Sequence, residues 1–119
     1  MDPSPVLVAV DASGVATVTI NRPAVRNAID PDVIRALTDA FATLGGDDRV
    51  RIVVLTGSGA AFCAGADLAY MRRAAAYSDA ENLADAKTIS HMLRTLNELP
   101  GKFVRTVAAV RDQKEKQAA

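Results

Sequence analysis

Apolar residues dominate two short runs near the start of the chain. Residues 6–10 (VLVAV) and 15–20 (VATVTI) are rich in valine, and the residues DASG lie between them. Two β-rich runs joined by Asp, Ser and Gly are typical of a β-hairpin. The sequence therefore predicts two antiparallel strands here.

The spacing of apolar residues then changes from strand-like to helical. They recur every three or four positions, at Val33, Ile34, Leu37, Phe41 and Leu44. Asp30 stands at the N-cap position, Pro31 suits the first helical position, and Gly45–Gly46 ends the run. The pattern predicts an amphipathic helix with one buried stripe.

A third strand and two further helices are expected after this helix. Residues 51–56 (RIVVLT) are too short and too β-branched for a helix, and their nearly continuous apolar character suits a strand covered on both faces. A helix is expected from about Asp67 to Ala76. Ser78 and Glu81 have the spacing of a capping box and open the next helix, which ends before Pro100-Gly101. Its apolar positions are Leu83, Ala86, Ile89, Leu93 and Leu96.

This order of elements predicts an α/β fold, in which a hairpin leads into a largely parallel sheet with crossover helices. Residues 102–110 (KFVRTVAAV) could form another strand, whereas residues 111–119 (RDQKEKQAA) read as a polar tail. We expect two regions, residues 1–100 and residues 101–119.

The amino-acid composition indicates which classes of binding partner to expect. Half of the 119 residues are apolar, which allows one domain with a modest core. Fourteen basic and fourteen acidic residues leave no net charge, and aromatic residues are scarce, so neither nucleic acid nor a membrane surface is an expected partner. The single cysteine and the lack of an apolar run of transmembrane length or a signal-peptide pattern favour a cytoplasmic setting.

The stretch SGAAFCAGADLAYM, residues 58–71, is the best candidate for chemistry. A reactive or metal-bound Cys63 would need a base or further ligands, and the helical pattern places the only histidine, His91, well away. A buried, inert thiol and no metal site are therefore expected. A phosphate cradle is disfavoured because the stretch lacks both the Walker lysine and the G-x-G-x-x-G spacing.

A third interpretation places the chemistry in the backbone. N–H groups near Gly65 and Ala66, at a helix N-terminus, could bind an oxyanion, such as an enolate or a tetrahedral intermediate. The alternative is a strand-to-helix turn that needs glycine for its shape alone. The residues by themselves leave both open.

Two segments resemble motifs of the crotonase, or enoyl-CoA hydratase/isomerase, family. VATVTINRPAVRNAID is similar to the family's strand followed by an N-R-P-x-x-x-N-A turn, and RIVVLTGSGAAFCAGADL to its strand followed by F-[CS]-A-G-[AG]-D-[LIF]. The resemblance covers Val6 to about Pro100. It implies a crotonase-like half-fold, the N-terminal half of the family fold, without its C-terminal half.

The resemblance also implies an acyl-coenzyme A site. Coenzyme A would be part of the substrate, with no tightly bound cofactor, and an oxyanion hole would hold the thioester enolate. Ala66 matches the residue whose backbone N–H is one of the two donors. Ala64 and Gly65 match positions lining the adenine and thioester end, followed by Asp67 and Leu68.

Three positions of the first motif, Ala24, Arg26 and Ala28, match residues that lie along the coenzyme A moiety. Arg26 could also meet a phosphate, although ordinary surface arginine is the alternative for Arg26 and for Arg22. The segment after the second motif looks most like methylglutaconyl-CoA hydratases. In that comparison Arg72–Arg73 would face a substrate carboxylate, or else solvent.

The resemblance ends where the family continues with a second glycine-rich segment, which supplies the other oxyanion donor, and with helices that supply catalytic glutamates. Glu81 and Glu98 lie on other segments and match neither glutamate. We therefore interpret the chain as a shortened enoyl-CoA hydratase/isomerase-like protein, a carbon–oxygen lyase by family, weakly active or inactive alone. Family members form trimers or dimers of trimers, which implies a homo-oligomer. The alternative is a non-catalytic binding or oligomer-assembly module.

Overall fold

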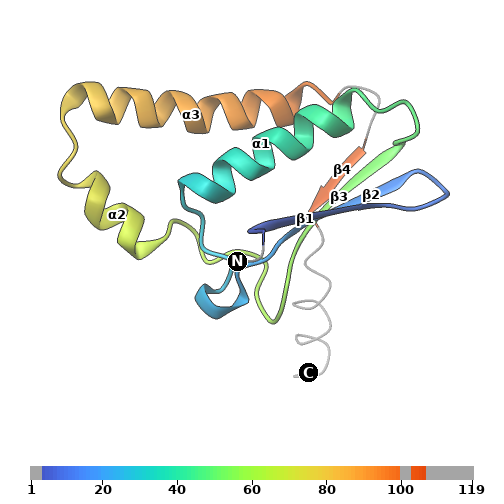
Figure 1. Ribbon diagram of the computed structural model, residues 1–119, viewed down its shortest axis with the longest axis horizontal. Helices are drawn as coiled ribbons and strands as arrows, with labels where there is room; N and C mark the ends of the chain where they lie inside the picture. The colour runs from blue at the N-terminus through green and yellow to red at the C-terminus, as the bar shows by residue number, and fades with distance from the viewer. Residues whose placement is uncertain (1–3, 100–102, 107–119) are drawn as a thin grey trace.

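The computed structural model describes residues 4–99 and the backbone of residues 103–106 (Figure 1). The elements are β1 (Val6–Val10), β2 (Val15–Ile20), the short 3-10 helix η1 (Pro23–Val25), α1 (Pro31–Gly45), β3 (Ile52–Gly57), α2 (Leu68–Ala74), α3 (Asp79–Asn97) and β4 (Phe103–Thr106). The predicted α/β fold and its order of strands and helices are confirmed.

The four strands form one sheet in the order β1-β2-β3-β4. β1 runs antiparallel to β2, whereas β2, β3 and β4 are mutually parallel. In this register Ile20 at the end of β2 is the partner of Gly57 at the end of β3. The two turns that follow these strands therefore leave the sheet at the same edge, and this brings the two sequence motifs together.

The core lies between the sheet and α1. Ala16, Val18 and Ile20 alternate along β2 and are buried, as the strand periodicity requires. The predicted stripe of α1 is buried as well: Val33, Ile34, Leu37, Phe41 and Leu44. Asp30 caps this helix by accepting a hydrogen bond from the Val33 N–H at 2.9 Å.

The prediction that the third strand is covered on both faces was wrong. Only Val53 of β3 is buried, while Ile52 and Val54 are half-buried. α1 and α3 both lie on the same side of the sheet (Figure 1), and the side chains of a strand alternate between its two faces. Among the described residues, Val53 is therefore the one fully covered side chain of this run, and Leu55 on the same face is half-buried.

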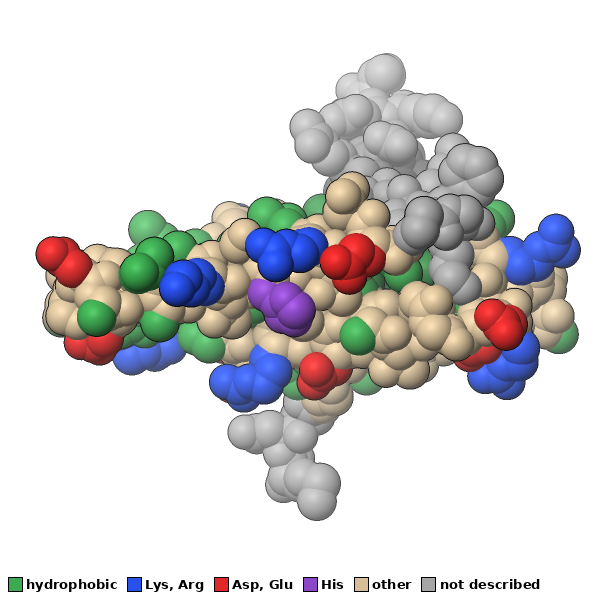
Figure 2. All heavy atoms as spheres, turned by 90° about the horizontal axis from the view of Figure 1, so that it is seen from above, with side chains coloured by type: hydrophobic (Ala, Val, Ile, Leu, Met, Phe, Trp, Pro, Cys, Tyr) green, Lys and Arg blue, Asp and Glu red, His purple; other side chains and the backbone are tan. Residues whose placement is uncertain are grey.

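The third helix begins as predicted, with the capping box in place. The Glu81 N–H donates to Ser78 Oγ at 3.2 Å, and the Ser78 N–H donates to Glu81 Oε1 at 3.3 Å. α3 packs against α1, but its apolar positions are incompletely covered: Leu83 is 58% exposed and Leu93 is 55% exposed. The helix extends past the end of α1 (Figure 1), and its surface in Figure 2 carries both positive and negative side chains.

The side chain of Tyr70 links α2 to α3. Tyr70 is buried, and its hydroxyl donates a hydrogen bond to the Asp85 carboxylate. Burial of the phenol, together with the neighbouring Asp85 charge, raises the pKa of Tyr70 to about 12. α2 and α3 are therefore linked by a tyrosine that is uncharged at neutral pH. We call this contact between Tyr70 and Asp85 the Tyr70 clamp.

The strand expected within residues 102–110 is confirmed for Phe103–Thr106. The boundary expected near residue 100 and the polar tail, residues 111–119, lie outside the described residues. Within the described part of the chain, no helix combines the length and apolar character needed to cross a bilayer.

The Tyr70 clamp can be tested by spectroscopic titration. The chain contains two tyrosines and no tryptophan, so a Tyr77→Phe variant leaves Tyr70 as the only phenol. We expect its tyrosinate absorbance to appear with a midpoint of about 12 in the folded protein and of about 10 in urea. The folded state keeps a proton that the unfolded state has lost over this window, so stability should fall as the pH rises through it. A folded-state midpoint at the urea value would contradict the clamp.

Candidate functional site

The two turns after β2 and β3, residues 21–30 and 58–67, join to form what we call the loop clasp. Three backbone hydrogen bonds hold them in parallel: the Ala64 N–H donates to the Arg26 carbonyl at 2.9 Å, the Ile29 N–H to Gly65 at 2.7 Å, and the Asp67 N–H to Ile29 at 2.8 Å. The clasp brings together both motifs that resemble the family.

Asn27 lies at the centre of the clasp and is fully buried. Its Nδ2 group donates to the carbonyls of Ser58 at 2.9 Å and Ala61 at 2.7 Å, and its Oδ1 accepts from the Arg22 N–H at 2.8 Å. Its backbone has a φ of +59°, which asparagine adopts more readily than most residues. One amide side chain thus links the two turns by bonding three part-buried backbone groups.

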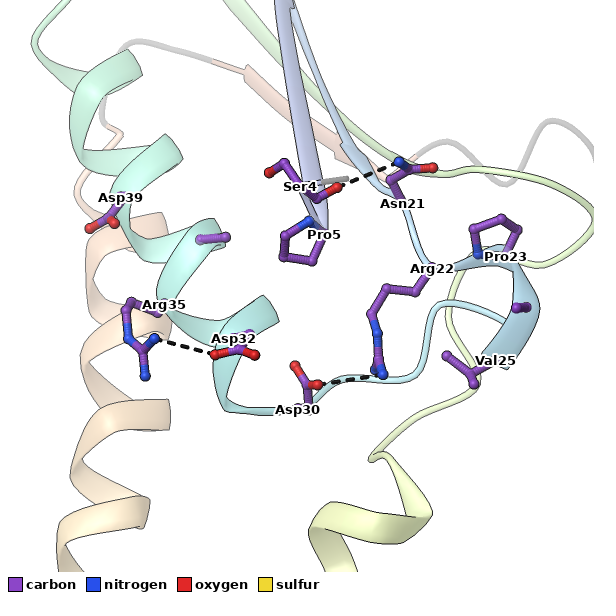
Figure 3. Close-up of a pocket in the computed structure, with 12 residues that line it drawn as sticks. Ser4, Pro5, Asn21, Arg22, Pro23, Val25, Asp30, Asp32, Arg35 and Asp39 are labelled. Carbon is purple, nitrogen blue, oxygen red and sulfur yellow. Dashed lines mark hydrogen bonds and ion pairs between the residues drawn. The ribbon is translucent and has the colours of Figure 1, made fainter. Parts of the chain in front are cut away.

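Arg22 connects the starts of α1 and α2 to the clasp. Its Nη1 donates to the Ala28 carbonyl at 2.5 Å. Both Nη1 and Nη2 lie 3.3 Å from Asp67 Oδ2. Nη2 also lies 3.4 Å from Asp30 Oδ2. Figure 3 shows the side chain reaching toward Asp30 across an open hollow of about 790 Å³. The surface-arginine alternative is therefore wrong for Arg22.

Asp67 serves as the N-cap of α2. Its Oδ1 accepts from the Tyr70 N–H at 3.0 Å, as Asp30 Oδ1 accepts from the first turn of α1. The Tyr70 N–H, followed by the Arg22 guanidinium, holds the pKa of Asp67 below its ordinary value, against the opposing effect of partial burial. Asp67 is consequently charged at neutral pH.

Two glycines of the second motif have different roles. A Cβ on Gly57 would lie 2.2 Å from the Phe62 carbonyl oxygen, so close packing of the turn requires glycine there. Gly65 has a φ of +101°, and a Cβ at this position would meet no described atom within 4 Å. Gly65 therefore sets the direction of the backbone and leaves the space outside it open.

The Ala66 N–H is directed away from the clasp. The bridge to Ile29 uses the carbonyl of Gly65 and the N–H of Asp67, which flank Ala66 on either side. No described residue accepts a hydrogen bond from the Ala66 N–H, and Ala66 is exposed. A ligand oxygen can therefore approach this donor.

The expected contribution of a helix N-terminus needs correction. Ala66 precedes the N-cap Asp67, so its N–H is not among the first-turn donors of α2, which has only seven residues. The Asp67 carboxylate also occupies the N-terminus that was expected to favour an anion. The orientation of the Ala66 backbone, rather than a helix dipole, is what the site offers.

Cys63 is half-buried, not buried as predicted. Its Sγ accepts a hydrogen bond from the Gly65 N–H at 3.4 Å. His91 is exposed on α3. The described residues contain no cluster of three His, Cys, Asp or Glu side chains that could hold a metal ion.

The remaining residues predicted for the site differ in accessibility. Ala24, Arg26, Ala64 and Leu68 are exposed, whereas Ala28 is buried and its carbonyl is engaged by Arg22. Arg26 contributes to a separate hollow of about 410 Å³, which is lined by Pro23, Arg26, Ser58, Ala60 and Ala61.

The charged residues of the two later helices lie apart from the clasp. Arg72–Arg73 are exposed in the last turn of α2. Glu81 caps the start of α3, and Glu98 is the residue at its C-terminal cap.

The structural roles of Asn27 and Arg22 did not emerge from sequence reasoning. The asparagine in VRNAI was a usable signal, because asparagine tolerates positive φ in tight turns. Its partners, two carbonyls more than thirty residues away, had no signal of their own.

Comparisons with known proteins bear on the family and the fold of this chain. A family model described as Enoyl-CoA hydratase/isomerase matches residues 11–111, and so runs past Pro100. A Thermus thermophilus protein assigned by name to the enoyl-CoA hydratases is 38% identical over 104 residues, which are 87% of this chain and 40% of the relative. The chain thus spans less than half the length of this relative.

Solved structures show the same partial coverage. The crystal structure of an enoyl-CoA hydratase from Shewanella pealeana matches with a TM-score of 0.81 at 28% identity. The match covers 86% of this chain and 38% of the Shewanella chain. The crystal structure of an enoyl-CoA hydratase from Mycobacterium smegmatis has a TM-score of 0.75 at 38% identity, with coverages of 87% and 39%.

The clasp predicts a large effect of Asn27 on stability. Asn27→Ala removes three hydrogen bonds and leaves alanine at positive φ, so we expect a loss of about 3 kcal/mol or more in the free energy of unfolding. Asn27→Gly should recover about 1 kcal/mol of this by relieving the backbone strain. Asn21→Ala is the control, because the Asn21 amide makes only a long bond, 3.5 Å, to the Ser4 carbonyl. Equal urea midpoints for Asn27→Ala and Asn21→Ala would contradict the role of the clasp.

Proposed function

Because the chain belongs to the enoyl-CoA hydratase/isomerase family, we propose that the loop clasp binds acyl-coenzyme A thioesters and that the Ala66 N–H donates a hydrogen bond to the thioester oxygen. The observation behind this proposal is that Ala66 is exposed and that its N–H has no acceptor among the described residues. Open space beside Gly65 gives the thioester room to approach.

The chemistry that such a donor serves is the stabilisation of an enolate. Negative charge moves onto the thioester oxygen when the α-carbon loses a proton or when water adds to the β-carbon of an enoyl thioester. A fixed donor aimed at that oxygen lowers the barrier, and removing one such donor typically costs about 100- to 1000-fold in rate. Hydration also needs an acid–base group, and no residue of this chain matches the family glutamates. We therefore propose weak activity, or none, for this chain alone.

The coenzyme A moiety would lie against the outer side of the clasp. The Arg26 guanidinium is exposed and has no partner among the described residues, so it is free to meet a phosphate. We propose that exposed Ala24 and Ala64 line this path and that Gly65 lines its thioester end. Buried Ala28 would support the turn from behind.

The acyl chain would extend toward α2. Leu68 is 70% exposed and Met71 is 52% exposed on this helix, immediately after the proposed donor. Asp67 would act by holding the start of α2 rather than by touching the ligand. Arg72–Arg73 remain candidates for a substrate carboxylate, although both are also placed as ordinary solvent-facing arginines.

A second function, as a non-catalytic binding or assembly module, is favoured by the edge of the sheet. β1 is an edge strand, and Leu7, Val8 and Val10 are all exposed on it. An exposed apolar edge strand promotes association. We propose a homo-oligomer in a cytoplasmic setting, with neither nucleic acid nor membrane as a partner.

Ligand binding separates these two functions. We expect acetyl-CoA to raise the melting temperature, with about 2.7 kcal/mol of stabilisation at a concentration 100 times the dissociation constant. Arg26→Ala should weaken binding, whereas Arg35→Ala should not, because Arg35 pairs with Asp32 on the exposed side of α1. Crotonyl-CoA should be hydrated slowly or not at all. No thermal shift at saturating acetyl-CoA would favour the assembly module, and rapid hydration would contradict the expected weak activity.

Cys63 should be dispensable for binding. We expect Cys63→Ala to leave the affinity for acetyl-CoA unchanged, because its thiol bonds the Gly65 N–H and leaves the Ala66 N–H untouched. Isothermal titration of both proteins provides the measurement. A large loss of affinity in the variant would show that the thiol, and not only the backbone, contributes to the site.

A further inference from the structure

We propose that Arg22 is a charge-compensating positioning residue, whose guanidinium neutralises the Asp67 carboxylate so that negative charge can develop at the Ala66 N–H. The ligand part of this inference rests on the proposed function. Its electrostatic part concerns the protein alone and can be measured without a ligand.

The geometry of the two aspartates is the first step. Asp67 and Asp30 each use Oδ1 to cap a helix and direct Oδ2 toward the same guanidinium. The Asp67 side chain is only 13% exposed and the Arg22 side chain 24% exposed. Solvent therefore screens this cluster less than it screens a surface pair.

Arg22 supplies the positive charge of this cluster. Its guanidinium lies beside both carboxylates, and among the described residues each carboxylate otherwise accepts only from uncharged donors such as the N–H of the helix turn that it caps. Removing the guanidinium leaves an excess negative charge on the residue that follows Ala66. An oxyanion bound at the Ala66 N–H would then meet a like charge, which disfavours its formation.

A purely structural tether is the competing explanation, because Arg22 also holds the Ala28 carbonyl. The two explanations predict opposite changes in amide hydrogen exchange. Base-catalysed exchange removes the amide proton as hydroxide takes it, and a transient negative charge remains on the nitrogen. An uncompensated carboxylate nearby slows this step, whereas a loosened turn cannot slow it, because no described acceptor protects the Ala66 N–H.

The first experiment measures exchange of the Ala66 amide by NMR in the full 119-residue chain. Arg22→Gln should slow this exchange by about three- to tenfold, equivalent to about half to one pKa unit. Adding Asp67→Asn should restore the wild-type rate. Asp67→Asn alone keeps a capping residue and should exchange faster than the wild type, which preserves the test should Arg22→Gln fail to fold. Arg35→Gln, which disrupts an exposed pair with Asp32, is the control and should change nothing.

The second experiment uses acetoacetyl-CoA, a β-keto thioester. Its α-carbon loses a proton to solvent, and the electron pair moves onto the carbonyl oxygens to give an enolate that absorbs in the ultraviolet. In the bound ligand, Arg22→Gln should raise the pKa of this ionisation by about one unit, and the added Asp67→Asn should reverse the rise. A structural tether would weaken binding without this reversal.

The outcomes distinguish failure of the proposed role of Arg22 from failure of the proposed acyl-CoA binding. Exchange at Ala66 that is unchanged or faster in Arg22→Gln, or that Asp67→Asn fails to restore, overturns the role of Arg22. An enolate pKa that Arg22→Gln leaves unmoved in the bound ligand overturns it as well. If the wild-type chain does not bind acetoacetyl-CoA at all, the proposed function fails, and the exchange experiment still decides the role of Arg22.

Discussion

The buried amide of Asn27 is the interaction on which the rest of the clasp depends. A sheet of parallel strands brings the turns after β2 and β3 to one edge but does not join them. Asn27 joins them by bonding two carbonyls of one turn and an N–H of its own. These bonds and the bridge from Ile29 to Gly65 and Asp67 together fix the register of the two turns, and the bridge directs the Ala66 N–H outward.

Charge is organised around the same clasp. The chain has no net charge, so any local field must come from the placement of individual groups. Arg22 is placed where two helix-capping carboxylates converge, and its backbone N–H also bonds to Asn27. Arg22 thus contributes to helix capping, to the geometry of the turn and to the electrostatics around the Ala66 N–H.

The described residues carry apolar side chains on their surface as well as in their core. The chain covers about 40% of a relative's length, and exposed leucines and valines lie on β1, α2 and α3. α1, by contrast, is buried along its whole apolar stripe, because the sheet packs directly against it. The described residues therefore combine a complete local core with faces suited to further contacts.

Local sequence determined the elements of this protein and the starts of α1 and α3. Valine-rich runs, the Asp30–Pro31 start of α1 and the Ser78–Glu81 capping box all act within a few residues, so their signals can be read directly from the chain. Recognition of two motifs also identified Ala66 as the candidate donor. Tertiary structure alone decided the partners of Asn27 and Arg22 and the exposure of Leu83 and Leu93. These features depend on which distant segments the sheet register and the helix packing bring together, and no local periodicity encodes that distance in space.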